Sequence, residues 1–219
     1  EKDAQDDILI KTEDWKFEER LSKEFEAVGF FISDHPLNQF TEIFSDYKII
    51  DYSSFISKEN LKDSNIAATL LKVQERKTAK GNSYAVLKLT DLSSVFELFI
   101  FSDILELNRE ILKEGSSFIL TLFKNISNDE NRLTRINVQK IASLKDLFNS
   151  PINEVSFDLN SHEQIEKISK ILQEDGKTVV NINLVNDDNI LKFRLRNTRK
   201  LNRKALNLLR NQEIKAIIN

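Results

Sequence analysis

The stretch from Ile66 to Leu144 constrains the fold most, because it predicts five β-strands with a single helix among them. The second of these strands alternates cleanly, with Ala85, Leu87 and Leu89 on one face, as a half-buried strand does. We expect that face to point inward. The expected strands, in chain order, are Ile66–Arg76, Ser83–Thr90, Val95–Phe101, Ser116–Ile126 and Leu133–Ser143, and the expected helix is Ser102–Lys113.

Three strands, a helix and two strands follow one another as in an OB-fold, a five-stranded β-barrel. Such barrels commonly bind oligonucleotides or oligosaccharides on the face of their second and third strands. We therefore expect a closed OB-fold barrel over residues 63–148. The third strand is almost wholly apolar, but its single charge indicates that Glu97, Phe99 and Phe101 point away from the interior.

A different pattern begins after Pro151. Strands and helices alternate in the order βαββαβ, which predicts a ferredoxin-like domain over residues 151–219, with two helices on one face of an antiparallel sheet. Its expected elements are Glu154–Leu159, Ser161–Glu174, Thr178–Val185, Ile190–Arg196, Asn202–Asn211 and Ile214–Ile218. An acidic linker (residues 1–14) and a helical lead-in (residues 15–62) come before the barrel, so the expected fold class is α+β.

The net charge of −3 hides a gradient along the chain. Residues 1–60 carry 15 acidic and 7 basic side chains, whereas residues 151–219 carry 9 and 12. The acidic start would repel phosphate, and the later segments would tolerate or attract it. A phosphate-bearing or acidic partner is therefore compatible with the later part of the chain only.

Catalytic and metal-binding signals are weak in this sequence. It has no cysteine and only two isolated histidines, His35 and His162, which excludes thiolate metal sites and makes a zinc centre implausible. The paired aspartates Asp6-Asp7 and Asp187-Asp188 fall in a linker and a turn, so we expect no metal or other cofactor. No apolar run is long enough to span a bilayer, and we expect a cytoplasmic protein.

Basic and aromatic residues gather where an OB-fold grips nucleic acid. Cations replace the counterions of phosphate, and a base stacked on a ring contributes about 1–3 kcal/mol. Glu75 and Glu97 are expected to oppose such binding. The alternative is a set of ordinary solvated barrel residues. The candidate nucleic-acid-binding residues are Arg76, Lys77, Lys80, Tyr84, Lys88, Phe99, Lys124, Arg132 and Arg135.

A second basic cluster lies in the last segment, where no acidic residue occurs between Ile190 and Gln212. A row of like charges on a strand costs stability, so a partner is expected to compensate it. An acidic protein surface or DNA phosphate could compensate it. The alternative is a solubilising surface. The candidate partner-binding residues are Lys192, Arg194, Arg196, Arg199, Lys200 and Arg203.

The segment Glu24–Leu37, with the sequence EFEAVGFFISDHPL, closely resembles a motif of the bacterial DNA polymerase III alpha subunit that precedes its OB domain. The loop Lys77–Gly81 and the strand Val95–Phe101 are similar to that domain as well. The resemblance runs from about Trp15 to Asn219 and implies the C-terminal region of the subunit. The last segment is similar to the domain that contacts the tau subunit of the clamp loader.

The resemblance implies a binding fragment of a DNA-directed DNA polymerase, a nucleotidyltransferase whose catalytic palm lies upstream. We therefore expect no enzymatic activity from this chain itself. Its implied role in DNA replication is to contact single-stranded template DNA through the OB-fold and to dock on tau. Gln5–Leu9 is also loosely similar to a peptide that binds the sliding clamp. A rival hypothesis is a protein-interaction scaffold whose OB-fold no longer binds nucleic acid.

Overall fold

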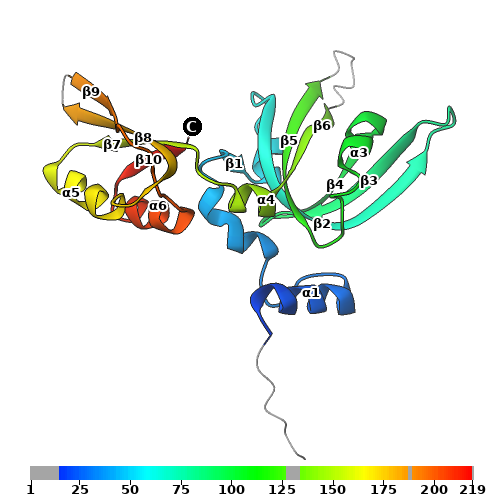
Figure 1. The fold of residues 1–219 in the computed structure, drawn as a ribbon. Helices are drawn as coiled ribbons and strands as arrows, with labels where there is room; N and C mark the ends of the chain where they lie inside the picture. The colour runs from blue at the N-terminus through cyan, green and yellow to red at the C-terminus, as the bar shows by residue number, and fades with distance from the viewer. Residues whose placement is uncertain (1–14, 127–133, 187–188, 219) are drawn as a thin grey trace, which may run out of the picture.

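Two β-sheets and several helices make up this computed structural model, which describes residues 15–126, 134–186 and 189–218 (Figure 1). The mixed α and β composition predicted from the sequence is confirmed. The α-helix α1 (Phe17–Val28) and the 3₁₀-helix η1 (Pro36–Ile43) precede the first sheet. In the part of the chain that is described, no helix is both long and apolar enough to cross a membrane.

The first sheet has the hydrogen-bonded order β4-β3-β2-β5-β6, and the short strand β1 pairs in parallel with β2. Three helices accompany it: α2 (Tyr52–Ser57), α3 (Ser102–Asn108) and α4 (Leu144–Asn149). The second and third predicted strands have the bounds expected of them. The strands are β1 (Ile49–Ile50), β2 (Asp63–Lys77), β3 (Ser83–Thr90), β4 (Val95–Phe101), β5 (Ser117–Ile126) and β6 (Thr134–Ser143).

The expectation of a closed barrel is wrong for the residues described. Strands β4 and β6 end the hydrogen-bonded path and come close together, but no described ladder joins them. Helix α3 contacts both strands, and its Leu105 is fully buried. The seam is therefore filled by apolar side chains of the helix instead of by backbone hydrogen bonds.

The expected facing of β3 and β4 is confirmed. Ala85, Leu87 and Leu89 are fully buried in the core of the first sheet. Along β4, Phe99 is 51% exposed and Phe101 is 59% exposed, because the alternate residues of this strand fill the core instead. The two aromatic side chains are thus available to a ligand.

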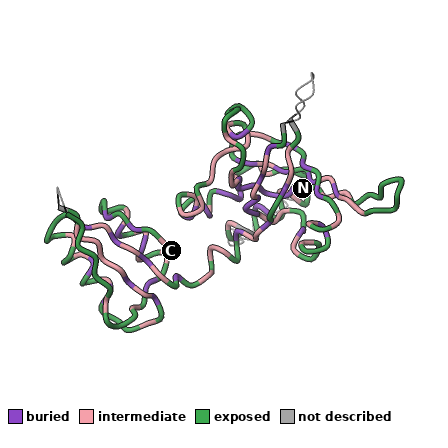
Figure 2. The backbone as a smooth tube through the Cα atoms, turned by 90° about the horizontal axis from the view of Figure 1, so that it is seen from above, coloured by how far each residue is buried: buried purple, intermediate pink, exposed green. Residues whose placement is uncertain are grey.

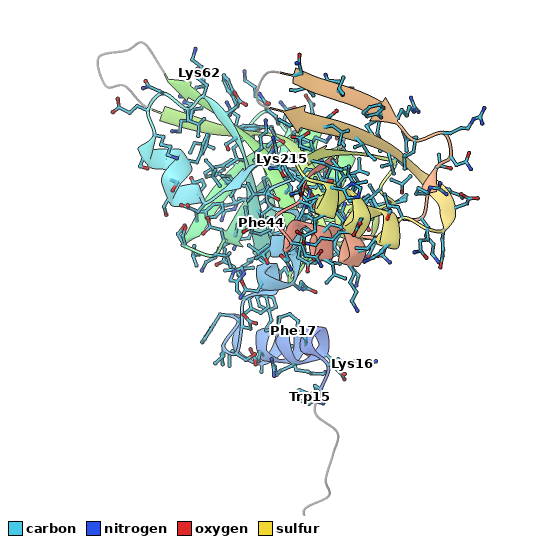
Figure 3. All side chains as sticks on the ribbon, turned by 90° about the vertical axis from the view of Figure 1, so that its left-hand side faces the viewer. Trp15, Lys16, Phe17, Phe44, Lys62 and Lys215 are labelled. Carbon is cyan, nitrogen blue, oxygen red and sulfur yellow. The ribbon has the colours of Figure 1, made fainter. Side chains whose placement is uncertain are left out.

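The segment before the sheet follows its sequence signals closely. Gly29 ends α1 in the left-handed region, with φ 77°, where glycine has no Cβ to strain the backbone. Leu37, Phe40 and Ile43 recur every three residues, the period of a 3₁₀-helix, and all three are buried under the first sheet. Helix α1, which begins at Phe17, lies on one side of both sheets (Figures 1 and 3).

The second sheet contains the predicted βαββαβ sequence of elements in the order β10-β7-β8-β9. The predicted antiparallel, ferredoxin-like sheet is wrong, because β7 and β8 are adjacent and parallel. A ferredoxin-like module splits this pair of strands with a third. The elements are β7 (Glu154–Leu159), α5 (His162–Ile171), β8 (Asp175–Asn186), β9 (Asn189–Arg194), α6 (Arg203–Arg210) and β10 (Lys215–Ile218).

The distribution of apolar residues explains this arrangement. Val180 of β8 is fully buried, and Ile182 and Leu184 pack against the same core, so β8 takes the place beside β7. All six residues of β9 are exposed, and its charges are solvated at an edge. Helices α5 and α6 contact each other and lie on one face of the sheet, as predicted (Figure 1). Figure 2 shows the buried positions gathered in separate regions on either side of the connecting chain.

Asp46 joins the second sheet to the segment before the first. Arg210 Nη2 donates to Asp46 Oδ1 at 2.5 Å, and Arg203 Nη1 lies 3.4 Å from Oδ2. The side chain of Asp46 is only 8% exposed. Arg203 also donates to the carbonyl oxygens of Leu147 (3.0 Å) and Phe148 (2.8 Å) at the end of α4. These contacts bind the two sheets together across a long stretch of sequence.

Candidate nucleic-acid interface

The outward side chains of β2, β3 and β4 form three cross-strand rows, which we call the outer face. The β2–β3 and β3–β4 registers place these residues directly beside one another. Each row runs from a polar or basic residue on β2, across β3, to β4. The rows are Lys72–Lys88–Glu97, Gln74–Val86–Phe99 and Arg76–Tyr84–Phe101.

A register shift in β2 creates part of this surface. Leu70 pairs with Leu89, but Lys72 pairs with Lys88, so Leu71 is an extra residue. Such a bulge reverses the facing of the residues beyond it. Leu70 is therefore buried in the core, while Lys72 lies exposed on the outer face.

Three cations and one aromatic ring share a shallow hollow of about 180 Å³ on the outer face. Its walls include Lys72, Arg76, Lys88 and Phe99. Glu97, opposite Lys88, contributes the one acidic side chain among the residues that line the hollow. The arrangement provides positive charge beside an exposed aromatic ring, and it can hold a phosphate and a base together.

Glu75 was expected to oppose nucleic-acid binding, but it does not lie on the outer face. It pairs across the strands with buried Ala85, on the other side of β2 from the outer face. Its two carboxylate oxygens accept from Arg109 Nε and Nη2, both at 3.1 Å. Arg109 follows α3, so Glu75 helps to hold that helix against the sheet.

The β2–β3 turn carries two of the predicted cations, Lys77 and Lys80. Thr78 closes the turn by donating its N–H to the carbonyl of Asn82 at 2.8 Å, and Gly81 takes a φ of 85°. The hairpin projects from the sheet (Figure 1), and its tip is exposed throughout (Figure 2). These lysines extend the basic surface beyond the outer face.

Lys124 does not belong to this interface. It is 5% exposed, and Nζ donates to the carbonyl oxygens of Phe55, Ile56 (3.2 Å) and Lys58 (2.9 Å). Nζ also lies 4.6 Å from the centre of the Phe55 ring. All three ammonium donors are used to cap α2, so none remains for phosphate.

The last two candidates lie elsewhere. Arg132 falls outside the described residues. Arg135 is exposed on β6, where it pairs with Asn125 of β5, so it is not part of the three rows of the outer face. The structure therefore groups Arg76, Tyr84, Lys88 and Phe99 of the predicted set, with the turn lysines nearby. Sequence reasoning omitted Lys72 and Phe101, although the exposure of Phe101 follows from the alternation of β4.

The predicted partner-binding cluster divides into two parts. Lys192, Arg194 and Arg196 are exposed at the β9 edge. Arg199 Nη1 pairs with Asp175 at 2.6 Å, and Lys200 pairs with Glu174 at 2.7 Å. That ion pair lowers the pKa of the Glu174 carboxyl.

Arg203 points inward, to Asp46 and the end of α4, which corrects its assignment to a partner surface. The accessible basic surface of the second sheet is thus smaller than the sequence predicted. Of the predicted cluster, the exposed cations for which the described residues provide no ion pair are Lys192, Arg194 and Arg196, along and just after β9.

Candidate metal ligands do not gather in the residues described. No group of three or more His, Asp or Glu side chains in that part of the chain could hold a metal ion. His35 accepts a hydrogen bond from Leu37 N–H at Nδ1 (3.1 Å), and burial lowers its pKa. It caps η1. Asp6-Asp7 and Asp187-Asp188 lie outside the described residues.

Comparison with known proteins agrees with the sequence motif. The DNA polymerase III subunit alpha of Rickettsia conorii is 31% identical over 158 residues, which is 68% of this chain and 12% of that protein. The resemblance to the DNA polymerase III alpha subunit is confirmed. The alpha subunit of Rickettsia bellii is 30% identical over 178 residues (74% and 14%), and that of Halalkalibacterium halodurans is 23% identical over 164 (74% and 14%).

This chain spans only 12–14% of the length of these alpha subunits. No family model matches it. The similarity therefore concerns one segment of these alpha subunits.

Proposed function

We propose that this chain is a binding module of a DNA polymerase III alpha subunit, which contacts single-stranded template DNA and docks on the tau subunit of the clamp loader. Residues 63–148 would form the DNA-contacting OB-fold and residues 151–219 the docking domain, after a helical lead-in over residues 15–62. Polymerisation would take place elsewhere in the subunit. The proposal rests on the outer face and on the confirmed resemblance.

Strand order supports an OB-fold interpretation of the first sheet. Its first long strand, β2, lies between β3 and β5, and the helix α3 falls between the third and fourth long strands. OB-folds are partly open barrels, so the gap between β4 and β6 is compatible with this fold. The outer face then corresponds to the surface of the second and third barrel strands, where such folds bind oligonucleotides.

The observation that carries the DNA role is the alignment of rings and cations on the outer face. Phe99 and Phe101 are two residues apart on one strand, about 7 Å along it. Each ring is more than half exposed and can support one base. Arg76 lies in the row of Phe101, and Lys72 and Lys88 lie in the row next to that of Phe99, so these cations can neutralise the phosphates between the bases. Stacking of this kind tolerates any base, as template binding requires.

Fluorescence anisotropy of the full chain with labelled oligo-dT tests this role. We expect binding that weakens steeply as salt rises, and at least a tenfold loss when Arg76 and Lys88 are both changed to Glu. The double variant Lys170→Glu, Lys177→Glu reverses the same number of charges at exposed positions of α5 and β8, serves as the control and should bind almost as the wild type. If the folded protein does not bind oligo-dT at low salt, the DNA role fails and the protein-interaction scaffold becomes the better hypothesis.

Docking on tau is supported by the exposed cations Lys192, Arg194 and Arg196, which have no acidic neighbour in the sequence from Ile190 to Gln212. Charge reversal at Arg194 and Arg196 should weaken capture of purified tau at least tenfold. Equal capture by wild type and variant would contradict this part of the proposal, independently of DNA binding.

A further inference from the structure

Strand β9 is an edge strand whose outward backbone groups can be identified. It ends the order β10-β7-β8-β9, and within the described residues no strand pairs with its other side. Leu195 N–H donates to Val180 O at 2.9 Å, so Leu195 directs its backbone toward β8. Backbone direction alternates along an antiparallel strand. Lys192 and Arg194 therefore direct their N–H and C=O groups away from β8, to the free edge.

The two faces of β9 differ in chemistry. Lys192 and Arg194 share the face that carries no helix, beside Asn183 and Asn181 of β8. Leu191 shares the opposite face with Leu184, which packs into the helix-covered core. A strand that joined this edge would thus meet cations on one face and apolar groups on the other.

The helix-side face of β9 is left partly uncovered. Leu191 is 59% exposed and Phe193 is 50% exposed, although their β8 neighbours contact the core. An apolar hollow of about 410 Å³ lies between the start of α5 and the β8–β9 hairpin, and Ile165, Leu184 and Leu191 line it. Peptides commonly bind where exposed apolar surface lies beside a free sheet edge.

We propose that the free edge of β9 receives an extended segment of a partner protein in which apolar and acidic residues alternate. The partner backbone would pair with the outward groups of Lys192 and Arg194. Its apolar side chains would enter the hollow beside Leu191 and Phe193, and its acidic side chains would meet the two cations. This inference rests on the proposed docking function and specifies how the docking is achieved.

Charge favours an acidic segment in particular. Two carboxylates of β7 lie on the same face: Asp158 accepts from Asn183 at 2.7 Å and from Lys215 at 2.8 Å, and Glu154 accepts from Asn181 at 2.7 Å. Because Asp158 is already paired with Lys215, Lys192 and Arg194 outnumber the remaining carboxylate and leave the edge positive. Nucleic acid fits less well, because the outward carbonyls of β9 would repel phosphate oxygens while a polypeptide N–H would satisfy them.

A peptide of alternating Glu and Val, eight residues long, acetylated and fluorescently labelled, provides the first test with the full chain. A control peptide carries the same residues as four Glu followed by four Val. We expect the alternating peptide to bind at least tenfold more tightly. Equal binding of both peptides would overturn the inference. Displacement of the alternating peptide by oligo-dT would overturn it as well.

The second test separates backbone pairing from charge. Lys192→Pro and Lys192→Ala both remove the ammonium group, but only proline also removes the outward N–H. Since that N–H does not bond to β8, proline should be tolerated at this edge, and matching thermal unfolding curves would verify it. We expect Lys192→Pro to bind the alternating peptide at least fivefold more weakly than Lys192→Ala. Equal affinities would refute edge pairing.

If Lys192→Pro loses stability, the same hydrogen bonds can be tested with a peptide that is N-methylated at alternate residues. N-methylation on the residues that face β9 should weaken binding to the wild-type chain at least fivefold, and an equally tight complex would again refute pairing.

Purified tau distinguishes this inference from the docking function on which it rests. If tau binding falls in Arg194→Glu but is equal in Lys192→Pro and Lys192→Ala, docking stands and edge pairing fails. If neither Arg194→Glu nor Lys192→Pro weakens tau binding, the docking function fails. The peptide comparison still decides whether the edge accepts a strand.

Discussion

Arg210 and Asp46 form an ion pair, Nη2 to Oδ1 at 2.5 Å, between residues that are far apart in sequence and belong to opposite ends of the chain. Asp46 also faces Arg203, so one carboxylate serves two guanidinium groups. Because the carboxylate is almost fully buried, its removal leaves two partly buried cations without an opposite charge, although both keep hydrogen bonds to backbone carbonyls.

Asp46→Ala should therefore lower the free energy of unfolding by about 3 kcal/mol. Urea denaturation measured by circular dichroism is the appropriate experiment. Glu42→Ala serves as the comparison, since exposed Glu42 accepts a hydrogen bond from Asn207 in the same junction. This substitution should cost less than about 1 kcal/mol. Equal losses in the two variants would contradict the importance of the buried pair.

Lys124→Met should destabilise the chain without changing its affinity for DNA. Methionine fills a similar volume but donates nothing to the three carbonyls at the end of α2, and we expect a loss of about 2 kcal/mol. Unfolding in urea and oligo-dT anisotropy, measured on the same preparation, test both halves. Weakened DNA binding by a fully folded variant would return Lys124 to the interface.

Phe99→Ala and Phe101→Ala should each weaken oligo-dT binding by about 1–3 kcal/mol, with little change in the salt dependence. Lys72→Ala should act differently and reduce the slope of log K against log salt by about 0.7, the value for one phosphate of a single strand. Anisotropy titrations at four or more salt concentrations separate the two effects. A changed slope in the phenylalanine variants would mean that they alter the path of the backbone.

Glu24 should contribute to stability in a pH-dependent way. Its Oε2 accepts from the N–H groups of Ile32 and Ser33, both at 2.9 Å, and hydrogen bonds from Ser33 and Ile32 lower the pKa of its carboxyl. A pKa that is lower in the folded state gives stability above the unfolded pKa, and this stability is lost as the pH falls through the folded value.

Glu24→Gln provides the comparison for this prediction, because glutamine resembles the protonated acid at every pH. The wild type should be the more stable protein at pH 7, and the difference should shrink toward zero as the pH falls below the ordinary range of a glutamate. Denaturation curves at several pH values measure it. A difference that stays constant down to pH 3 would contradict the role of the ionised carboxylate.

The sequence predicted the elements better than their arrangement. The alternation of Ala85, Leu87 and Leu89 fixes which face of β3 is buried, so the outer face could be anticipated. The bulge at Leu71 left no comparable signal, because a regular alternation from Leu70 would turn Lys72 inward. Lys72 was therefore missed because the bulge shifts the register of β2, and not because its residue type was misleading.

Lys124 and the second sheet show two other sources of error. The pattern Phe118, Leu120, Leu122 continues to Lys124, so alternation already placed this lysine on the buried face, and its charge was given too much weight. The order of elements βαββαβ, in contrast, is compatible with more than one strand order. The strand order is decided because β8, which is apolar, takes the inner position and β9, which is basic, stays at the edge.

The junction at Asp46 has a mechanical consequence. A hinge between the two sheets would absorb a pull on the β9 edge as rotation. A rotation between α6 and the segment before β1 would separate Asp46 from Arg203 and Arg210, so these two ion pairs oppose such a hinge motion.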